Sequence, residues 1–145
     1  MSKGAYLLII FLESKKKIRT KGRTFTLEPG YYVYVGSGMR SLEKRVLRHF
    51  RRKKKLHWHI DYLLKEAELL RAYLIFSSER LEERLSLEVG RYGEPVKGFG
   101  SSDLKVKSNL YRFDSRPDKV IVGILDKMNV EWKRIDSAGG AGAGI

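Results

Sequence analysis

The segment YYVYVGSGMRSLEKRVLRHF, residues 31–50, decides the expected fold of this chain. Aromatic and β-branched residues dominate 31–36, which is typical of a β-strand. The strand ends in a Gly-Ser-Gly sequence that predicts a sharp turn out of the sheet. Ser41 is a suitable helix N-cap, and from there to about Lys55 apolar residues recur at helical spacing, namely Leu42, Val46 and Phe50. The segment therefore predicts a strand, a turn and an amphipathic helix.

The predicted helix also has a basic face. On a helical wheel three arginines fall within roughly 60° of one another and away from the apolar stripe; these are Arg45, Arg48 and Arg52. His49 lies between the two faces, and Lys53 continues the basic run. Guanidinium groups beside the open N–H groups of a turn, with Gly36 and Ser37, suit a phosphodiester. The alternatives are a solvated basic face and a histidine that only packs.

Composition limits the possible functions. The chain has 145 residues, a formal net charge of +13 and no cysteine. Such a charge attracts polyanions, either nucleic acid or an anionic membrane surface, and the lack of cysteine excludes disulfides and thiolate metal sites. No apolar run approaches about 18 residues and no signal-peptide core is visible, so we expect a soluble cytoplasmic protein.

The whole pattern predicts one α/β domain over residues 1–135, followed by a Gly/Ala-rich segment, 136–145, that we expect to be disordered. Three strands in close succession predict an antiparallel meander, at 5–12, in a basic hairpin at 15–27, and at 31–36. Further helices are expected at 57–68, 78–93 and about 116–128, with strand-like segments at 69–77, 96–113 and 130–135. We therefore expect an α/β sandwich with a small antiparallel central sheet, of about three strands, flanked by helices.

Several motifs, in order, resemble the GIY-YIG nuclease family. They are GAY at 4–6, YVG at 34–36 and RVLRH at 45–49. The motifs YVYVGSG, RVLRHF, HWHIDYLL and GFGSSD further resemble a branch of small standalone prokaryotic domains of unassigned function. The resemblance implies a GIY-YIG-like sandwich and a Mg²⁺-dependent (or Mn²⁺-dependent) endonuclease that acts on DNA, in DNA repair or processing.

The resemblance also implies catalytic residues. Tyr6 and Tyr34 match the tyrosines of the two motifs, one as a general base and the other as its orienting partner. A tyrosine can act as a base if its pKa of about 10 is depressed locally. Arg45 matches the helix arginine of the family, with Arg48 and His49 in positions that often follow, and Gly36 closes the second motif.

The family places a metal-binding glutamate on a later helix, here 78–93. Leu81, Leu85 and Val89 define the buried stripe of that helix by their spacing. On the same wheel Glu82 borders the stripe whereas Glu83 points away, so Glu82 is the expected ligand and Glu83 the alternative. A single carboxylate leaves water and substrate oxygens around Mg²⁺, as that ion prefers.

The sequence also departs from the family pattern. The family's late asparagine has no secure counterpart, although Asn109 is a candidate, and Asp103 could add a carboxylate or orient a loop. HWHID, residues 57–61, offers two histidines and an aspartate, but with so few histidines we expect no structural zinc, and we expect Trp58 to pack. The basic hairpin around Lys21 is either a clamp over DNA or a sheet edge kept soluble by its lysines.

Two functions fit these residues. The first is the metal-dependent DNA endonuclease, and the second is an inactive DNA- or RNA-binding module on the same scaffold. Both predict salt-sensitive binding, so charge alone does not separate them. The pairing of Arg45 with a cleft-facing glutamate favours the enzyme, because a pure binding module gains nothing from a negative charge beside the phosphate.

Overall fold

Strand β1 (Gly4–Leu12) is the centre of the fold. Its sequence, GAYLLIIFL, contains apolar residues and a single tyrosine, and all of its residues but Phe11 are buried. It pairs antiparallel with β4 (Gly30–Gly38) on one side and with β5 (Glu68–Phe76) on the other. The strand expected at 5–12 is therefore confirmed.

The computed structural model describes residues 2–100 and 108–137. In these ranges β1 belongs to a sheet of six strands in the order β6-β7-β4-β1-β5-β8, all paired antiparallel. The edge strands are β6 (Glu94–Pro95) and β8 (Glu131–Asp136), and β7 (Leu110–Phe113) lies between β6 and β4. The α/β class and the antiparallel pairing are confirmed, whereas the expected number of about three strands is wrong. Pairing between distant segments, such as β1 with β5, leaves no local signal in the sequence.

The basic hairpin forms a sheet of its own. Its strands are β2 (Lys16–Thr20) and β3 (Arg23–Leu27), and they pair only with each other. The expected hairpin is therefore confirmed, but it is not the middle of a meander. Its apolar side chains, among them Ile18 and Phe25, pack into the core beside the main sheet.

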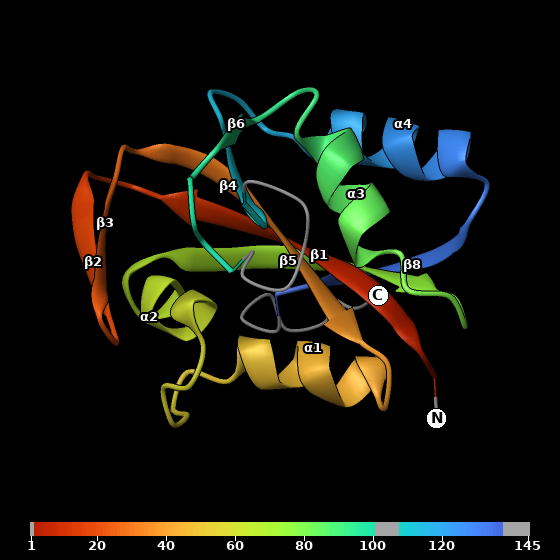
Figure 1. Cartoon of the computed structure of the whole chain (residues 1–145), viewed down its shortest axis with the longest axis horizontal. Coiled ribbons are helices and arrows are strands. Elements are labelled where there is room, and N and C mark those ends of the chain that lie inside the picture. The colour runs from red at the N-terminus through yellow and green to blue at the C-terminus, as the bar shows by residue number, and fades with distance from the viewer. Residues whose placement is uncertain (1, 101–107, 138–145) are drawn as a thin grey trace.

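The helices cover the two faces of the sheet (Figure 1). They are α1 (Leu42–Phe50), α2 (His59–Glu66), α3 (Glu82–Val89) and α4 (Asp118–Met128). Along β1, Tyr6 and its alternate neighbours pack with α1, α2 and the hairpin, whereas Leu7 and its alternate neighbours pack with α3 and α4. This alternation is the two-residue period of a strand, and it gives the domain two apolar cores.

Two local expectations around α1 are wrong. The Gly-Ser-Gly sequence is not a turn, because Gly36, Ser37 and Gly38 continue β4 and pair with residues of β1. The chain turns only at 39–40. Helix α1 also ends at Phe50 rather than near Lys55, so Arg52 does not share its basic face.

The end of α1 is capped by a lysine side chain. Arg51 adopts an extended conformation, with φ −69° and ψ 129°. Lys54 folds back and donates hydrogen bonds from Nζ to the carbonyls of His49 and Arg51, at 2.9 and 2.8 Å. These bonds satisfy carbonyl groups that a helix end leaves without partners.

The remaining expectations concern the later elements. The helices expected at 57–68, 78–93 and 116–128 are observed as α2, α3 and α4, each shorter than expected. The expected C-terminal strand is β8, and most of the segment expected to be disordered lies outside the described residues. None of the helices in the described ranges is long and apolar enough to cross a bilayer.

Candidate active site

The ring of Tyr6 lies across Gly36. The two residues face each other on β1 and β4. A Cβ atom built on Gly36 would overlap the Cζ, the hydroxyl oxygen and the Cε1 of Tyr6. Because residue 36 has no side chain, the Tyr6 ring can pack directly against its backbone. This packing, rather than a turn, accounts for glycine at this position.

The hydroxyl of Tyr6 is hydrogen-bonded to His49. Its oxygen lies 2.7 Å from Nε2 of the histidine, and the two ring centroids are 5.2 Å apart. Both side chains are 2% exposed. Burial, the largest effect, lowers the pKa of His49 to about 4, so the imidazole is neutral at pH 7. Its Nδ1 has no hydrogen-bond partner within residues 2–100 and 108–137.

The two candidate tyrosines are neighbours on the same face of the sheet. Their ring centroids are 6.4 Å apart. Burial raises the pKa of Tyr6 well above its ordinary value, and it raises the pKa of Tyr34 as well. The charge of Glu82 adds to both shifts, and the charge of Arg45 opposes them. Both phenols are therefore neutral at pH 7, so the depressed pKa that a tyrosine base requires is not present in the chain alone.

Trp58 lies under two guanidinium groups. The Cζ atoms of Arg45 and Arg48 are each 4.7 Å from the centroid of its ring. Cations over an indole face are attracted by its quadrupole. Trp58 is half-buried, so it packs, as the sequence analysis expected. Both arginines therefore lie on the side of α1 that faces Trp58.

Asp61 fixes the position of Arg48. Its carboxylate accepts two hydrogen bonds from the guanidinium, at 2.9 and 3.1 Å, and two more from the backbone N–H groups of His57 and Trp58, at 2.8 and 2.9 Å. Burial alone would raise the pKa of Asp61, but the hydrogen bonds from Arg48 and the two amides hold it below its ordinary value. Arg48, expected to bind nucleic acid, is therefore engaged in an internal ion pair.

Glu82 approaches the tyrosines from the start of α3. Its Oε2 accepts a hydrogen bond of 3.1 Å from Nδ2 of Asn109, which also donates to the carbonyl of Gly100 at 2.8 Å. Asn109 is 1% exposed, and its Oδ1 has no hydrogen-bond partner among the described residues. The expected buried stripe of this helix is confirmed, with Leu81, Leu85 and Val89 all buried.

Other expected site residues lie elsewhere. Arg52 and Lys53 follow the end of α1 and line a separate basic pocket of about 460 Å³. Ser37 pairs with Ala5, so it lies on the sheet face opposite Tyr6. Glu83 is half-buried on α3. Asp103 lies outside the described residues.

Asn109 faces the carboxylate of Glu82 with its Nδ2, whereas its Oδ1 has no hydrogen-bond partner among the described residues. In the described ranges no group of three or more His, Asp or Glu side chains is placed to hold a metal ion. The rings of His57 and His59 pack on aromatic neighbours.

Sequence reasoning missed a second group of residues beside this cluster. Tyr62 and Lys21 line a pocket that also includes Tyr34. The spacing of His59 and Tyr62 on one helix was the available signal, because residues three apart share a helix face. The hairpin around Lys21 was named from the sequence as a possible DNA clamp, but only the fold brings it against α2.

The cluster thus gathers a neutral tyrosine–histidine pair, a second tyrosine, an arginine and a carboxylate from β1, β4, α1 and α3. A comparison with protein families matches residues 5–130 to a domain of unknown function, DUF123. The match spans most of the chain, so the chain belongs to this family. No curated protein and no solved structure matches the chain.

Proposed function

We propose that this member of the DUF123 family is a divalent-metal-dependent endonuclease, on a GIY-YIG-like scaffold, that hydrolyses DNA phosphodiester bonds in DNA repair or processing. The observation that carries the proposal is the hydrogen bond between Tyr6 and His49, with Arg45 and Glu82 close enough to shift the pKa of the same hydroxyl. A proton relay, a cation and a carboxylate around one point are the groups that phosphodiester hydrolysis requires.

Each side chain has a role in this proposal. Tyr6 accepts a proton from the attacking water and passes its own phenolic proton to Nε2 of His49, in the imidazole tautomer that carries its hydrogen on Nδ1. Arg45 stabilises the charge that develops on the phosphate. Tyr34 orients the water. Glu82 and Asn109 would hold Mg²⁺ or Mn²⁺, which supplies Lewis-acid activation of the phosphate when bound.

One observation favours the second function, an inactive DNA- or RNA-binding module. Burial raises the pKa of both tyrosines, so neither is a ready base in the chain alone. A binding module needs no base, and its arginines would serve affinity only. The two proposals differ over Glu82, whose removal abolishes cleavage in the enzyme but strengthens DNA binding in the module.

The test is single-turnover cleavage of end-labelled DNA with Mg²⁺ or with EDTA. Arg45→Ala is expected to reduce the rate by about 10²–10³-fold, as for other groups that stabilise transition-state charge. Arg116→Ala, an exposed arginine ahead of α4, is the matched control and should cut normally. Glu82→Gln should be inactive whereas Glu83→Gln should not.

The outcomes separate the proposals. Cleavage that is lost in EDTA and in Arg45→Ala supports the nuclease. If Glu83→Gln is inactive and Glu82→Gln is not, the metal ligand is Glu83 and the enzyme stands. No cleavage by the wild type, together with tighter DNA binding by Glu82→Gln, supports the binding module.

A further inference from the structure

An aromatic pocket lies beside the candidate active site. It has a volume of about 300 Å³. Its lining comes from the hairpin turn, β4 and the start of α2, and includes Lys21, Tyr34, His57, Trp58, His59 and Tyr62. The proposed function assigns a role in this set only to Tyr34, which leaves most of the HWHID motif without a function.

We propose that this pocket holds a single nucleobase taken out of the DNA stack, next to the phosphate that the active site cuts. The inference rests on the proposed function and specifies its substrate class as DNA that carries an unpaired or extrudable nucleotide. The chemistry of the lining carries it. Proteins bind unstacked bases by stacking on aromatic rings and by hydrogen bonds to the base edge.

The size and polarity of the pocket suit one base. A volume of about 300 Å³ is at the lower end for small-molecule sites, which fits one nucleoside rather than a longer segment. The imidazoles of His57 and His59 and the hydroxyl of Tyr62 supply donors and acceptors among the rings. Lys21 is exposed on the turn between β2 and β3, where its ammonium group suits a backbone phosphate.

The walls of the pocket are held in place before any ligand binds. The ring of His59 packs against Phe25 and Phe99, at centroid distances of 5.6 and 5.7 Å. Trp58 is fixed through its backbone N–H by Asp61 and lies under the guanidinium of Arg45. These two residues therefore form rigid walls. A preformed site avoids the cost of ordering side chains upon binding.

Tyr34 and Tyr62 are the stacking surfaces. Both are half-buried, so part of each side chain is open to the pocket. Trp58 is a poorer platform, because guanidinium groups already lie over its ring. The pocket thus combines two tyrosines with fixed walls, which is the arrangement that accepts a base of any identity.

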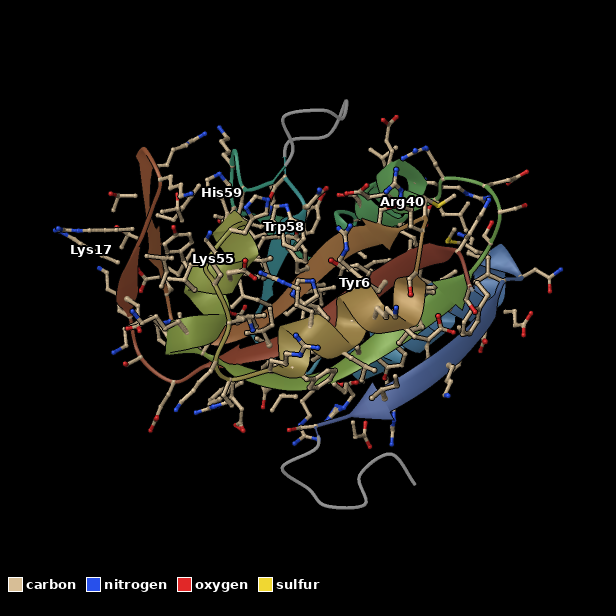
Figure 2. All side chains as sticks on the ribbon, turned by 90° about the horizontal axis from the view of Figure 1, so that it is seen from below. Tyr6, Lys17, Arg40, Lys55, Trp58 and His59 are labelled. Carbon is tan, nitrogen blue, oxygen red and sulfur yellow. The ribbon has the colours of Figure 1, made fainter. Side chains whose placement is uncertain are left out.

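The pocket and the proposed active site share side chains. Tyr34 lines the pocket, and its ring centroid is 6.4 Å from that of Tyr6. Trp58 lines the pocket and contacts Arg45. In Figure 2, Trp58 lies between Tyr6 and His59, and Lys17 points outward from the hairpin. A base in the pocket would therefore belong to a nucleotide next to the scissile phosphate.

The test compares two short duplexes that contain the fluorescent base 2-aminopurine, either paired with thymine or as a single-base bulge. Both are titrated with the full chain in EDTA, where no cleavage is expected. The bulged duplex should bind about tenfold more tightly or better, which is the gain expected from stacking one base on an aromatic side chain. Its fluorescence should fall on binding, because stacking quenches 2-aminopurine.

Three variants test whether the preference for the bulged duplex depends on the ring of Tyr62. Tyr62→Ala should abolish the preference for the bulge and leave binding of the paired duplex unchanged. Tyr62→Phe keeps the ring and should retain the preference, which separates stacking from a folding defect. Tyr92→Ala, which removes a tyrosine that is 58% exposed and does not line the pocket, is the matched control and should bind like the wild type.

Different results would refute the base pocket and the proposed nuclease function. Equal affinity for the two duplexes, or a preference that survives in Tyr62→Ala, overturns the base pocket even if the chain cuts DNA with Mg²⁺. A bulge preference that depends on the Tyr62 ring supports the pocket, and if neither duplex is then cut with Mg²⁺, only the nuclease proposal is lost.

Discussion

Replacement of Gly36 by alanine tests how the Tyr6 ring is placed. The added Cβ would overlap three atoms of Tyr6, of which Cε1 would be at 2.7 Å. The ring has little room to move, since it is 2% exposed and its hydroxyl bonds to His49 at 2.7 Å. Overpacking of this kind costs about 1–3 kcal/mol of the free energy of unfolding. For a chain of this size the melting temperature should fall by roughly 5 °C.

A double-mutant cycle assigns that cost to one contact. The three atoms nearest to the new Cβ all belong to Tyr6. In a Tyr6→Leu background, which is itself destabilised by loss of a buried ring, Gly36→Ala should therefore cost less than about 0.5 kcal/mol. Urea unfolding of the four proteins, followed by circular dichroism, measures each free energy.

Gly123→Ala is the control. A Cβ on this glycine of α4 has no neighbour within 4 Å. Alanine should therefore be neutral or stabilising by up to about 1 kcal/mol, from helix propensity. If Gly36→Ala costs the same with and without the Tyr6 ring, the methyl group collides with something else, and our explanation of this glycine is wrong.

Asp61→Asn should lower the free energy of unfolding by about 3 kcal/mol, because it removes the charge that faces the partly buried Arg48. If urea unfolding shows that the free energy of unfolding falls by less than about 0.5 kcal/mol, this ion pair is not stabilising in the way we expect. The pKa of His49 lies at about 4 in the folded chain, below its ordinary 6.5, so the unfolded chain binds the extra proton. The free energy of unfolding should therefore fall as the pH drops from about 6.5 to 4, by up to about 3 kcal/mol, and His49→Gln should flatten this dependence in urea titrations. DNA affinity should fall steeply with salt concentration, because the chain carries a formal net charge of +13. Lys21→Ala should reduce the slope of the logarithm of the DNA association constant against the logarithm of salt concentration by about 1. An unchanged slope would show that Lys21 does not contact a phosphate.

The sequence predicted those parts of the fold in which apolar residues repeat at strand or helix spacing. The apolar run of β1 and the Leu81, Leu85 and Val89 stripe of α3 repeat at strand and helix spacing, and both are observed. The size of the sheet was missed because β5 joins β1 across a long stretch of chain. Periodicity reports which residues are buried, but it does not report which distant strand covers them.

The second wrong prediction was the turn at Gly36-Ser37-Gly38. Gly36 read as a turn residue because glycine permits unusual backbone angles. In the structure it lies in β4, and its lack of a side chain admits the Tyr6 ring. Gly4 is similar, since a Cβ there would overlap the carbonyl oxygen of Ile75. Close approach between strands is a tertiary requirement, and the sequence does not distinguish it from a turn.

Within the candidate site, sequence placed the residues on the right elements but not all of their partners. Helix periodicity put Glu82 at the edge of the buried stripe, and the structure brings its carboxylate to Asn109. The same reasoning put Arg48 and Arg52 together on one face, whereas Asp61 engages Arg48 and the helix ends before Arg52. Ion pairs between separate elements depend on the tertiary fold, so a helical wheel could not predict them.

The most direct test of the central claim is nicking of supercoiled plasmid by the purified chain, with Mg²⁺ and with EDTA, beside Tyr6→Phe. This variant keeps the ring over Gly36 and removes only the hydroxyl that bonds to His49. We expect Mg²⁺-dependent conversion to nicked and linear DNA by the wild type, and loss of that activity in the variant. Equal nicking by both proteins, or none by the wild type with Mg²⁺, would contradict it.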